Sequence, residues 1–592
     1  MCGILLGIFA REGAAAATAA ATDAIPAVSK PLWRALQHAN SRRGPDGHSS
    51  ITLPLTRTHT AVLEGWTLHL RGKDTVTQPI QDAHGSWLCF NGEIFGGLQP
   101  AAGRIYFGRD VLGRRSLLWR FPKDAQRPFY IASVAPLESS TAPVEDGESL
   151  QEGWEEIPAD GMYCLSLANG PQERISRRHL KHVPWRQPDQ PPDEAHITST
   201  EISIPAPFVR LATTLPDPSD LLEVEPDDSA KFPHRTLPSI VSALDKLEQI
   251  LAESVKARVE NIPPASTPTF ARLGILFSGG LDCICLAALA DRFLPPGEPC
   301  DLLNVAFESA RKRANPTPQK SKRGKGAEHG GEAGTATNDN TNDSKDGDDS
   351  IYTVPDRLTG LSGVAQLRAR YPTRDWRFVE INIPYPDAVA ARSHIHALMN
   401  PLDTEMDISI AIAFWFAARG NGHIRSPTTG EKQPYTSAAK VLFSGLGADE
   451  QLGGYSRHRT AFEKRSWAGL IEEVQTDIDR ISTRNMGRDD RIVSDHGKEV
   501  RFPYLSEHLL AYLCTLPMHV KTDPRYPRGV GEKLLLRELC RRLGLVRAAG
   551  EPKRAVQFGA RSAKMDVGTR AVRGGWRVGK GGSGREVEGD KE

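Results

Sequence analysis

The stretch L-G-I-L-F-S-G-G-L-D-C at residues 273–283 decides the fold class of this chain. The apolar run 273–277 predicts a buried strand, and the Gly279-Gly280 pair predicts a turn. The apolar stretch 284–293 that follows predicts a helix, and 302–307 predicts the next strand. Strand, glycine turn, helix and strand in this order indicate an α/β fold with a parallel, doubly wound sheet.

The turn at Ser278–Cys283 has the features of an anion-binding loop. Glycines let the backbone approach a ligand closely, while the N–H groups and the dipole of the following helix attract phosphate. The carboxylate of Asp282 can hold Mg²⁺. The spacing differs from G-x-x-x-x-G-K-[ST] and matches the pyrophosphate loop of enzymes that cleave ATP to AMP and pyrophosphate. A plain turn is the alternative, which the full hexapeptide disfavours.

A second acidic turn, S-G-L-G-A-D-E at residues 444–450, follows the apolar strand predicted at 441–443. Because strand carboxyl ends meet at one edge of a doubly wound sheet, Asp449 is expected to complete a Mg²⁺ site with Asp282. A surface turn with solvated acids is the alternative. The dense charges at 488–491 and 499–501 fit either a structural ion-pair network or the lining of an active site.

Composition excludes several classes of protein. The 592 residues leave room for more than one domain, and 74 basic against 73 acidic residues give a net charge of +1. No global field therefore draws the chain to nucleic acid or to a membrane surface. The longest uncharged apolar run, 408–418, is shorter than the ~18–20 residues of a membrane span and predicts a buried helix. Eight scattered cysteines without C-x-x-C, and a first segment without a basic leader, favour reduced thiols in the cytoplasm.

Two ordered blocks are expected. The first, residues 2–182, has short alternating segments at 66–70, 86–90 and 162–167 and is predicted to be β-rich. A Pro-rich linker is expected at 183–235. The second block, 236–565, opens with an amphipathic helix at 240–259. A disordered insertion is expected within this block at 310–350, and a flexible tail is expected after it at 566–592.

The first residues suggest a nucleophile. Removal of Met1 would expose the thiol of Cys2 together with its own α-amino group, which can act as a general base. Position 2 alone is weak support, but R-G-P-D at 43–46, N-G-E-I at 91–94 and G-R-D at 108–110 follow. The side-chain amide of Asn91 and the backbone N–H of Gly92 are suited to an oxyanion hole.

These motifs, in this order along most of the chain, resemble the glutamine-dependent asparagine synthetase family. The family has an N-terminal class II glutamine amidotransferase domain, an Ntn-type β-sandwich between helices, and a C-terminal ATP-pyrophosphatase domain. Four further strings resemble its divergent eukaryotic branch, the asparagine synthetase domain-containing proteins: L-H-L-R-G at 68–72, G-R-D-V-L-G-R-R-S-L-L at 108–118, P-D-R-L-T-G at 355–360 and P-K-R-A-V-Q-F-G at 552–559.

The resemblance implies that asparagine is made from aspartate, glutamine and ATP through a β-aspartyl-AMP. Cys2 would attack the glutamine amide, and Asn91 and Gly92 would stabilise the oxyanion. Arg71 would hold the glutamine carboxylate, and Glu93 would help to hold the amino acid. The sequence leaves the oligomeric state, a homodimer included, undecided.

For the second domain the resemblance implies a site for ATP and Mg²⁺. Asp282 and Asp449 would bind the metal, and Lys553 would lie near the adenylated carboxylate. The residues that would grip pyrophosphate or border the nucleotide are Phe277, Ser278, Gly279, Gly280, Asp282, Phe307, Ser444 and Gly445.

Three departures from the family pattern bear on activity. Leu446 stands where active asparagine synthetases carry Glu, and it cannot take a proton from attacking ammonia. Cys283 replaces a serine and offers weaker hydrogen bonds to phosphate. Only residues 98–107 separate the N-G-E-I segment from G-R-D, where the family has several dozen residues that include the Asp for the glutamine amino group, so the first domain is expected to be trimmed.

Two functions remain open from the sequence. The first is an asparagine-forming ligase, which Cys2, S-G-G-L-D and G-A-D-E favour. The second is a catalytically degenerate homologue that acts as a nucleotide-binding or regulatory module, which Leu446 and the short 98–107 segment favour. A β-lactam-type ligation on the same scaffold would need no working Cys2, and Cys2 with its downstream motifs argues against it.

Overall fold

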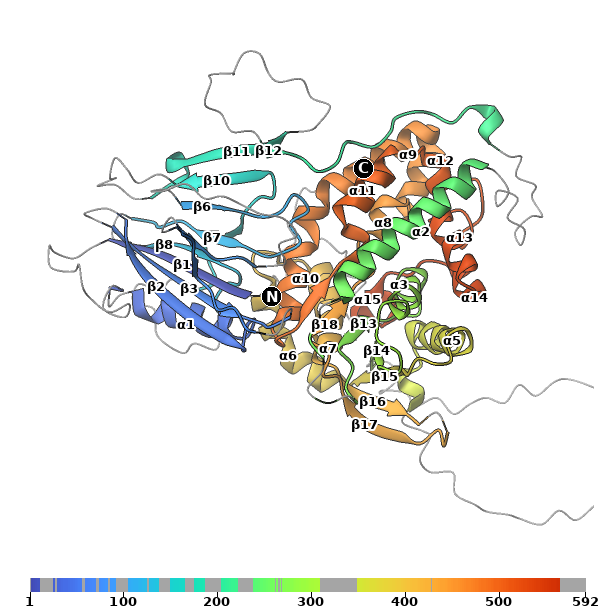
Figure 1. The fold of residues 1–592 in the computed structure, drawn as a ribbon, viewed down its shortest axis with the longest axis horizontal. Coiled ribbons are helices and arrows are strands. Elements are labelled where there is room, and N and C mark those ends of the chain that lie inside the picture. Colours follow the sequence, from blue (N-terminus) through green and yellow to red (C-terminus); the bar gives the residue numbers. More distant parts are fainter. Residues whose placement is uncertain are drawn as a thin grey trace, which may run out of the picture.

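The computed structural model describes residues 2–10, 25–26, 29–55, 59–70, 74–83, 86–91, 105–124, 127–137, 150–165, 175–186, 204–221, 238–260, 262–264, 267, 269–308, 349–426 and 428–564. Figure 1 shows a block of strands from the N-terminal half beside a larger block of helices and strands, with helix α10 (Met486–Ser494) at their junction.

The described part of the N-terminal block contains two larger sheets, a two-stranded sheet and the α-helix α1. The first sheet has the strand order β2-β3-β1-β8-β7-β9, the second has the order β12-β11-β10-β6, and β4 and β5 form a separate pair. Their bounds are β1 Cys2–Ala10, α1 Lys30–Ser41, β2 Gly47–Pro54, β3 His59–Thr67, β4 Ile80–Gln81, β5 Trp87–Leu88, β6 Ile105–Gly108, β7 Leu118–Arg120, β8 Phe129–Ala132, β9 Trp154–Glu156, β10 Gly161–Leu165, β11 Leu180–Arg186 and β12 Ile204–Pro205.

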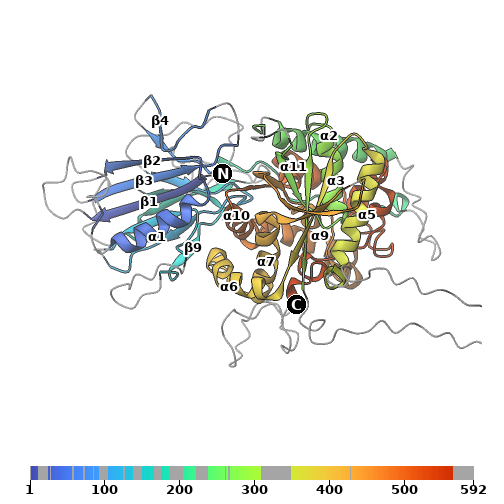
Figure 2. The same cartoon turned by 90° about the horizontal axis from the view of Figure 1, so that it is seen from below.

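Alternation along β1 explains how this block packs. Leu5 and Phe9 join a core with Trp33 of α1, whereas Leu6 and Ile8 join a separate core with the second sheet. Side chains two residues apart on a strand share a face, so β1 buries one face against α1 and the other against the second sheet. In Figure 2, α1 lies along the strands of the first sheet. The β-rich character predicted for this block is confirmed.

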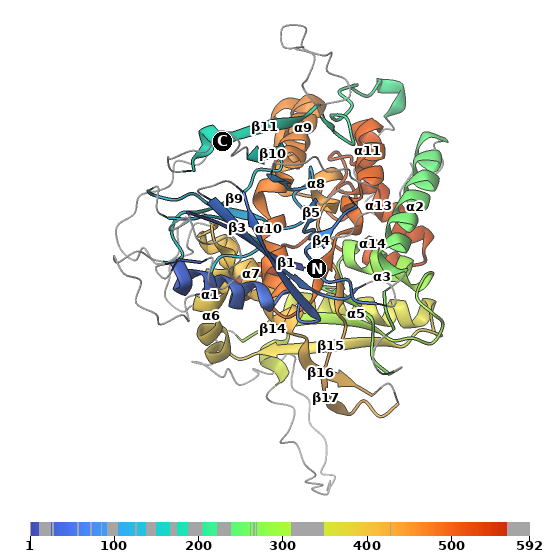
Figure 3. The same ribbon diagram turned by 60° about the vertical axis from the view of Figure 1, so that its left-hand side comes forward.

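The C-terminal block is built on one seven-stranded sheet in the order β17-β16-β15-β14-β13-β18-β19. Strand β13 pairs in parallel with β14 and β18, and the pairs β14–β15 and β18–β19 are also parallel. The hairpin β16–β17 adds antiparallel strands at one edge, which Figure 3 shows at the far end of the sheet. The bounds are β13 Leu273–Leu276, β14 Cys300–Phe307, β15 Trp376–Ile383, β16 Asn421–Arg425, β17 Lys432–Thr436, β18 Val441–Phe443 and β19 Glu499–Arg501.

Helices cover both faces of this sheet. Residues of α2, α3 and α13 belong to one hydrophobic core, and residues of α6, α7 and α10 belong to the other. The doubly wound architecture predicted from 273–283 is therefore confirmed. The helices are α2 Pro238–Val259, α3 Leu281–Asp291, α5 Pro355–Arg370, α6 Tyr385–Met399, α7 Glu405–Arg419, α8 Ala448–Gln451, α9 Ser456–Arg484, α10 Met486–Ser494, α11 Glu507–Thr515, α12 Met518–Lys521, α13 Leu534–Arg542, α14 Val546–Ala549 and α15 Val556–Gly559.

The predicted elements differ from the observed ones mainly at their ends. Helix α3 begins at Leu281, three residues before the predicted start, because Gly280 in an extended conformation serves as its N-cap. The apolar run at 408–418 lies within α7, whose Ile408, Ile412 and Phe416 are buried in the core. Among the described residues, no helix combines the length and the apolar character needed to cross a bilayer.

The expected linker boundary at 182/183 needs correction. Strand β11 runs through it to Arg186, and β12 at 204–205 pairs with β11. The second sheet of the N-terminal block therefore includes residues that proline content assigned to a linker, because edge strands tolerate proline. Of the insertion expected at 310–350, residues 310–348 lie outside the described residues, whereas 349–350 are ordered and begin a 3-10 helix, Asp349–Tyr352. The tail expected at 566–592 also lies outside the described residues.

Candidate active site

The glycine turn after β13 has the geometry of a phosphate-binding loop. Gly279 has a φ of 76°, and a Cβ atom there would lie 2.2 Å from the carbonyl oxygen of Thr359. Only glycine fits this position, because of both its left-handed backbone and this close approach. The hydroxyl of Thr359 donates to the carbonyl of Ser278 at 2.7 Å, which ties the loop to α5. The turn is therefore held open toward the N-terminus of α3, where anions bind.

Cys283 has a structural role in this loop. Its thiol donates to the carbonyl of Gly280 at 3.2 Å and lies 3.7 Å from the hydroxyl of Ser278. Burial raises the pKa of the Cys283 thiol to about 11. The thiol is therefore neutral near pH 7, and its hydrogen bond to Gly280 stabilises the turn.

The two acidic residues predicted to meet do lie together. Nζ of Lys533 lies 2.8 and 2.9 Å from the two carboxylate oxygens of Asp282, and 3.0 Å from Oδ1 of Asp449. Lys553 pairs with Oδ2 of Asp449. Two carboxylates and two ammonium groups thus form one charged cluster, the carboxylate–lysine cluster, beside the phosphate-binding loop.

Electrostatics fix the charges in this cluster. Burial favours neutral Asp449, but Lys533 and Lys553 outweigh it and hold the pKa of that carboxyl well below its ordinary value. Burial also disfavours the Lys533 ammonium, yet Asp282 and Asp449 raise its pKa above the ordinary value. Burial, together with Asp449, raises the pKa of Asp282 against the effect of Lys533. Asp449 and Lys533 are therefore charged at neutral pH.

Lys533 was not identified from the sequence. It is almost fully buried and has a left-handed backbone, with a φ of 53°, immediately before α13. Its only signal in the sequence is a charged pair, Glu532-Lys533, between a glycine-rich turn and an amphipathic helix. This pattern does not predict that Lys533 contacts Asp282, which lies far away in the sequence.

The acidic turn after β18 closes on the phosphate-binding loop. A Cβ atom on Gly445 would lie 2.8 Å from Cβ of Asp282, so the two turns nearly touch. Glu450 accepts hydrogen bonds from the backbone N–H of Gly447 at 3.1 Å and from the Tyr455 hydroxyl at 2.5 Å. Glu450 therefore shapes the turn, while the half-buried Leu446 packs against the core that contains Phe307 and Leu505.

A divalent cation fits this cluster. Mg²⁺ in proteins commonly takes one or two carboxylates and completes its shell with phosphate oxygens and water. Asp282 and Asp449 lie on either side of the Lys533 ammonium, which contacts Oδ1 of Asp449 at 3.0 Å and both oxygens of Asp282. These two carboxylates are the groups that could hold the metal.

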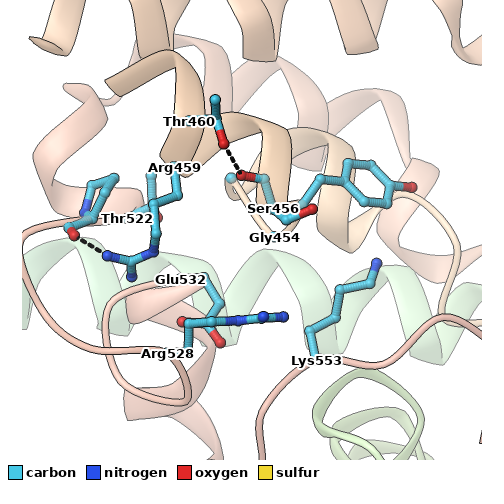
Figure 4. A pocket seen from close by; sticks show the side chains of 11 residues that line it. Gly454, Ser456, Arg459, Thr460, Thr522, Arg528, Glu532 and Lys553 are labelled. Carbon is cyan, nitrogen blue, oxygen red and sulfur yellow. Dashed lines mark hydrogen bonds between the residues drawn. The ribbon is translucent and has the colours of Figure 1, made fainter. Parts of the chain in front are cut away.

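A pocket of about 150 Å³ opens next to the cluster. In Figure 4 the side chains of Arg528, Glu532 and Lys553 surround the cavity, and Ser456 and Thr460 line its upper side. Arg459 at its rim donates to the carbonyls of Pro524 and Tyr526. Oε2 of Glu532 is buried without a hydrogen bond among the described residues. The pocket therefore offers both cationic groups and an acceptor to a small polar ligand.

The side chains of Phe277 and Phe307 lie in the core. Phe277 stacks edge-on against Phe378, and Phe307 against Phe416. Both rings are almost fully buried, so only the backbone of these two residues is available to border a nucleotide.

The predicted glutamine site lies only partly within the described residues. The backbone of Cys2 starts β1 and pairs with Thr67, but its side chain is outside the described part, as are Arg71, Gly92 and Glu93. Asn91 ends the described segment 86–91, whose Phe90 N–H donates to the side chain of Gln78. Gln78 in turn lies against Gly65 of β3, the strand next to β1.

The dense charges at 488–501 form the ion-pair network that the sequence left open. Asp490 accepts from Arg43 at 2.6 Å and from Arg115 at 3.2 Å, and Arg115 lies 3.3 Å from Glu499. Burial would raise the pKa of Asp490, but the two guanidinium groups lower it. This network joins the two blocks and lies apart from the carboxylate–lysine cluster.

Comparison with known proteins gives consistent results. A family model described as Asparagine synthase matches residues 462–565, which include Lys533 and Lys553. Asparagine synthetase domain-containing protein 1 of Mus musculus is 34% identical over 91% of this chain and 95% of its own length. The Homo sapiens protein of the same name is 34% identical over 91% and 93%. The glutamine-hydrolyzing asparagine synthetase of Bos taurus is 32% identical over only 21% of each chain.

Proposed function

Since this chain belongs to the asparagine synthetase domain-containing protein 1 branch of the asparagine synthase family, we propose that its C-terminal block binds ATP and transfers AMP to a carboxylate. The observation that carries the proposal is the meeting of the 278–282 loop with Asp449, Lys533 and Lys553. Anion-binding backbone, two carboxylates and two ammonium groups are the groups that AMP-forming chemistry needs in one place.

Each residue then has a role in the reaction. A carboxylate oxygen of the acceptor attacks the α-phosphorus of ATP, the bond to pyrophosphate breaks, and an acyl-adenylate forms. The backbone of Gly279 and Gly280, with the N-terminus of α3, holds the departing pyrophosphate. Lys553, next to the pocket, offsets charge on the transferred group. Mg²⁺ bound by Asp282 and Asp449 would supply further charge neutralisation.

We assign aspartate as the acceptor and ammonia as the nitrogen donor, which gives asparagine through a β-aspartyl-AMP. The pocket beside Lys553 supports an amino acid with extra negative charge. Arg528 and Lys553 suit carboxylates, and the buried Oε2 of Glu532 suits an α-ammonium group.

For the N-terminal block we propose a trimmed class II glutamine amidotransferase over residues 2–182, extended through β11, with Cys2 as nucleophile. Its support is the start of β1 at Cys2 and the sandwich of two sheets. The proposal includes weak glutamine hydrolysis, because the short 98–107 segment lacks an acid for the substrate ammonium group. It also includes residence in the cytoplasm, supported by the seven described cysteines, all free thiols.

A nucleotide-binding module without turnover is the second candidate, favoured by Leu446. AMP formation separates the two. The full chain is incubated with ATP, Mg²⁺, aspartate and ammonium, and AMP, pyrophosphate and asparagine are measured. Aspartate-dependent AMP that disappears in Lys553→Met, but not in the surface control Lys256→Met, supports the ligase. ATP binding without AMP would support the module, and an absence of ATP binding would contradict both.

A further inference from the structure

Asp356 lies at the edge of the sheet that carries the proposed nucleotide site. It is in the first turn of α5, in the P-D-R-L-T-G string. The side-chain amide of Asn304 on β14 donates to the carbonyls of both Asp356 and Phe277 at 2.9 Å. Thr359, one helical turn later, donates to Ser278. The backbone of Asp356 is therefore fixed to the strand that ends in the phosphate-binding loop.

The carboxylate of Asp356 accepts no hydrogen bond in the described part of the chain, and its one charged neighbour there is Arg554, which acts on it through space. The residue is 5% exposed. The neighbouring Arg357, in contrast, donates to Asn304 at 2.7 Å and to Asn382 at 2.8 Å. Buried polar groups in proteins are nearly always paired, and the exceptions commonly belong to functional sites.

Gly559 leaves the space that this carboxylate occupies. A Cβ atom at Gly559 would lie 1.9 Å from Oδ1 of Asp356, so any other residue would displace the acid. Gly559 ends α15, within the P-K-R-A-V-Q-F-G string that also carries Lys553. Two sequence strings that the reaction above uses only in part therefore meet at this carboxylate.

The position and charge of Asp356 select its ligand. The phosphates of a nucleotide belong at 278–282, and an acid repels them. An acid beside the loop instead accepts from neutral N–H or O–H groups, which the nucleoside part of a nucleotide carries on its base and sugar. We propose that Asp356 accepts a hydrogen bond from the nucleoside part of the bound nucleotide and so determines which nucleotide is selected. This inference rests on the proposed function.

Calorimetric titration of the full chain at pH 8 tests the assignment, because burial raises the pKa of Asp356 to about 7 and the carboxylate is charged above that pH. ATP is titrated into wild type, Asp356→Ala and the isosteric Asp356→Asn. Loss of a hydrogen bond to a charged group weakens affinity about 10- to 100-fold, so that loss is expected for Asp356→Ala, with a smaller one for Asp356→Asn. Asp301→Asn is the matched control. Asp301, on β14, is a buried acid like Asp356, but its carboxylate accepts from the Tyr435 hydroxyl at 3.0 Å. Its ATP affinity should equal that of wild type.

Analogues identify the contacted group. Inosine triphosphate lacks the base amino group, and 2′-deoxy- and 3′-deoxy-ATP each lack one sugar hydroxyl. The analogue without the contacted donor should bind wild type about 10-fold more weakly than ATP, and Asp356→Ala should not distinguish that analogue from ATP. Pyrophosphate alone should bind wild type and Asp356→Ala equally.

Three results would overturn the inference. Equal ATP affinity in wild type and Asp356→Ala would show that the carboxylate does not contact the nucleotide. An equal loss of affinity for pyrophosphate would show that it acts through the loop, and retained discrimination among the analogues would assign selectivity elsewhere. If wild type binds no ATP, the proposed function itself fails. ATP binding that Asp356→Ala leaves unchanged contradicts only the assignment of Asp356.

Discussion

The ammonium group of Lys533 contacts both oxygens of the Asp282 carboxylate, at 2.8 and 2.9 Å, although 251 residues separate the two in sequence. The same ammonium lies 3.0 Å from Asp449, on a different turn. One buried lysine therefore holds together the two turns that define the edge of the candidate site. Its left-handed backbone shows that the fold places it there against its local preference.

Replacement of Lys533 by Met should destabilise the protein. Two partly buried carboxylates would lose their shared counter-charge, and removal of one partner from a buried ion pair commonly costs about 3–5 kcal/mol. The free energy of unfolding is measured in urea. The control is Lys256→Met, which removes an exposed pair with Glu260 and should cost less than about 1 kcal/mol. Equal stability of the two variants would contradict a structural role for Lys533.

The sequence was sufficient for the parts of the site that lie at strand ends. Asp282 and Asp449 could be placed together because each follows a strand, and parallel strands end at one edge. Lys533 could not be placed, because it follows an irregular turn and reaches the cluster only through tertiary packing. The aromatic residues Phe277 and Phe307 were placed at the correct edge, but sequence does not reveal that their rings point into the core.

The junction between the blocks shows a similar limit. The charges at 488–491 predicted either a network or a site, because the sequence does not show which residues of the N-terminal block reach them. Arg43 and Arg115 do so across more than 300 positions in the chain. The R-G-P-D string thus contributes an interdomain contact that its resemblance alone did not indicate.

Asp356→Asn should stabilise the protein at pH 8 and much less at pH 5. Burial raises the pKa of Asp356 from its ordinary range to about 7. The folded state therefore binds the proton more tightly than the unfolded state, and the free energy of unfolding of wild type falls as pH rises from about 4 to 7. The neutral side chain of the Asp356→Asn variant does not titrate, so the variant keeps the free energy of unfolding that wild type loses, up to about 4 kcal/mol above pH 7. Urea unfolding at both pH values checks it, and a gain of the same size at pH 5 would contradict it.

The pair Arg43–Asp490 should couple the two blocks. Both side chains are almost fully buried, so Arg43→Ala or Asp490→Ala should each cost about 3–5 kcal/mol of stability, with a coupling above about 1 kcal/mol in the double mutant. The exposed pair Arg210–Asp479 is the control and should couple by less than about 1 kcal/mol. Strict additivity at Arg43 and Asp490 would show that the pair contributes nothing specific.

Leu446 should limit amide formation even when ammonium replaces glutamine. It stands where the resemblance to active asparagine synthetases implies a Glu, and the loss of a general base commonly removes ~10²–10⁴-fold in rate. AMP formation should survive while asparagine formation is slow, and Leu446→Glu should recover part of the rate. Asparagine and AMP are quantified from aspartate, ATP and ammonium. Rapid asparagine synthesis by wild type would show that this Glu is not required.

Binding of Mg²⁺-ATP by calorimetry, in wild type and in Asp282→Ala, tests the central claim that the 278–282 loop and the carboxylate–lysine cluster form a nucleotide site. Asp282 would hold the metal, and it contacts Lys533, which would then lie beside the phosphates, so its removal should abolish Mg²⁺-dependent binding. Asp301→Asn, a buried acid paired away from the loop, should bind as wild type does. The account predicts one ATP site in wild type and none in Asp282→Ala; equal affinities would contradict it.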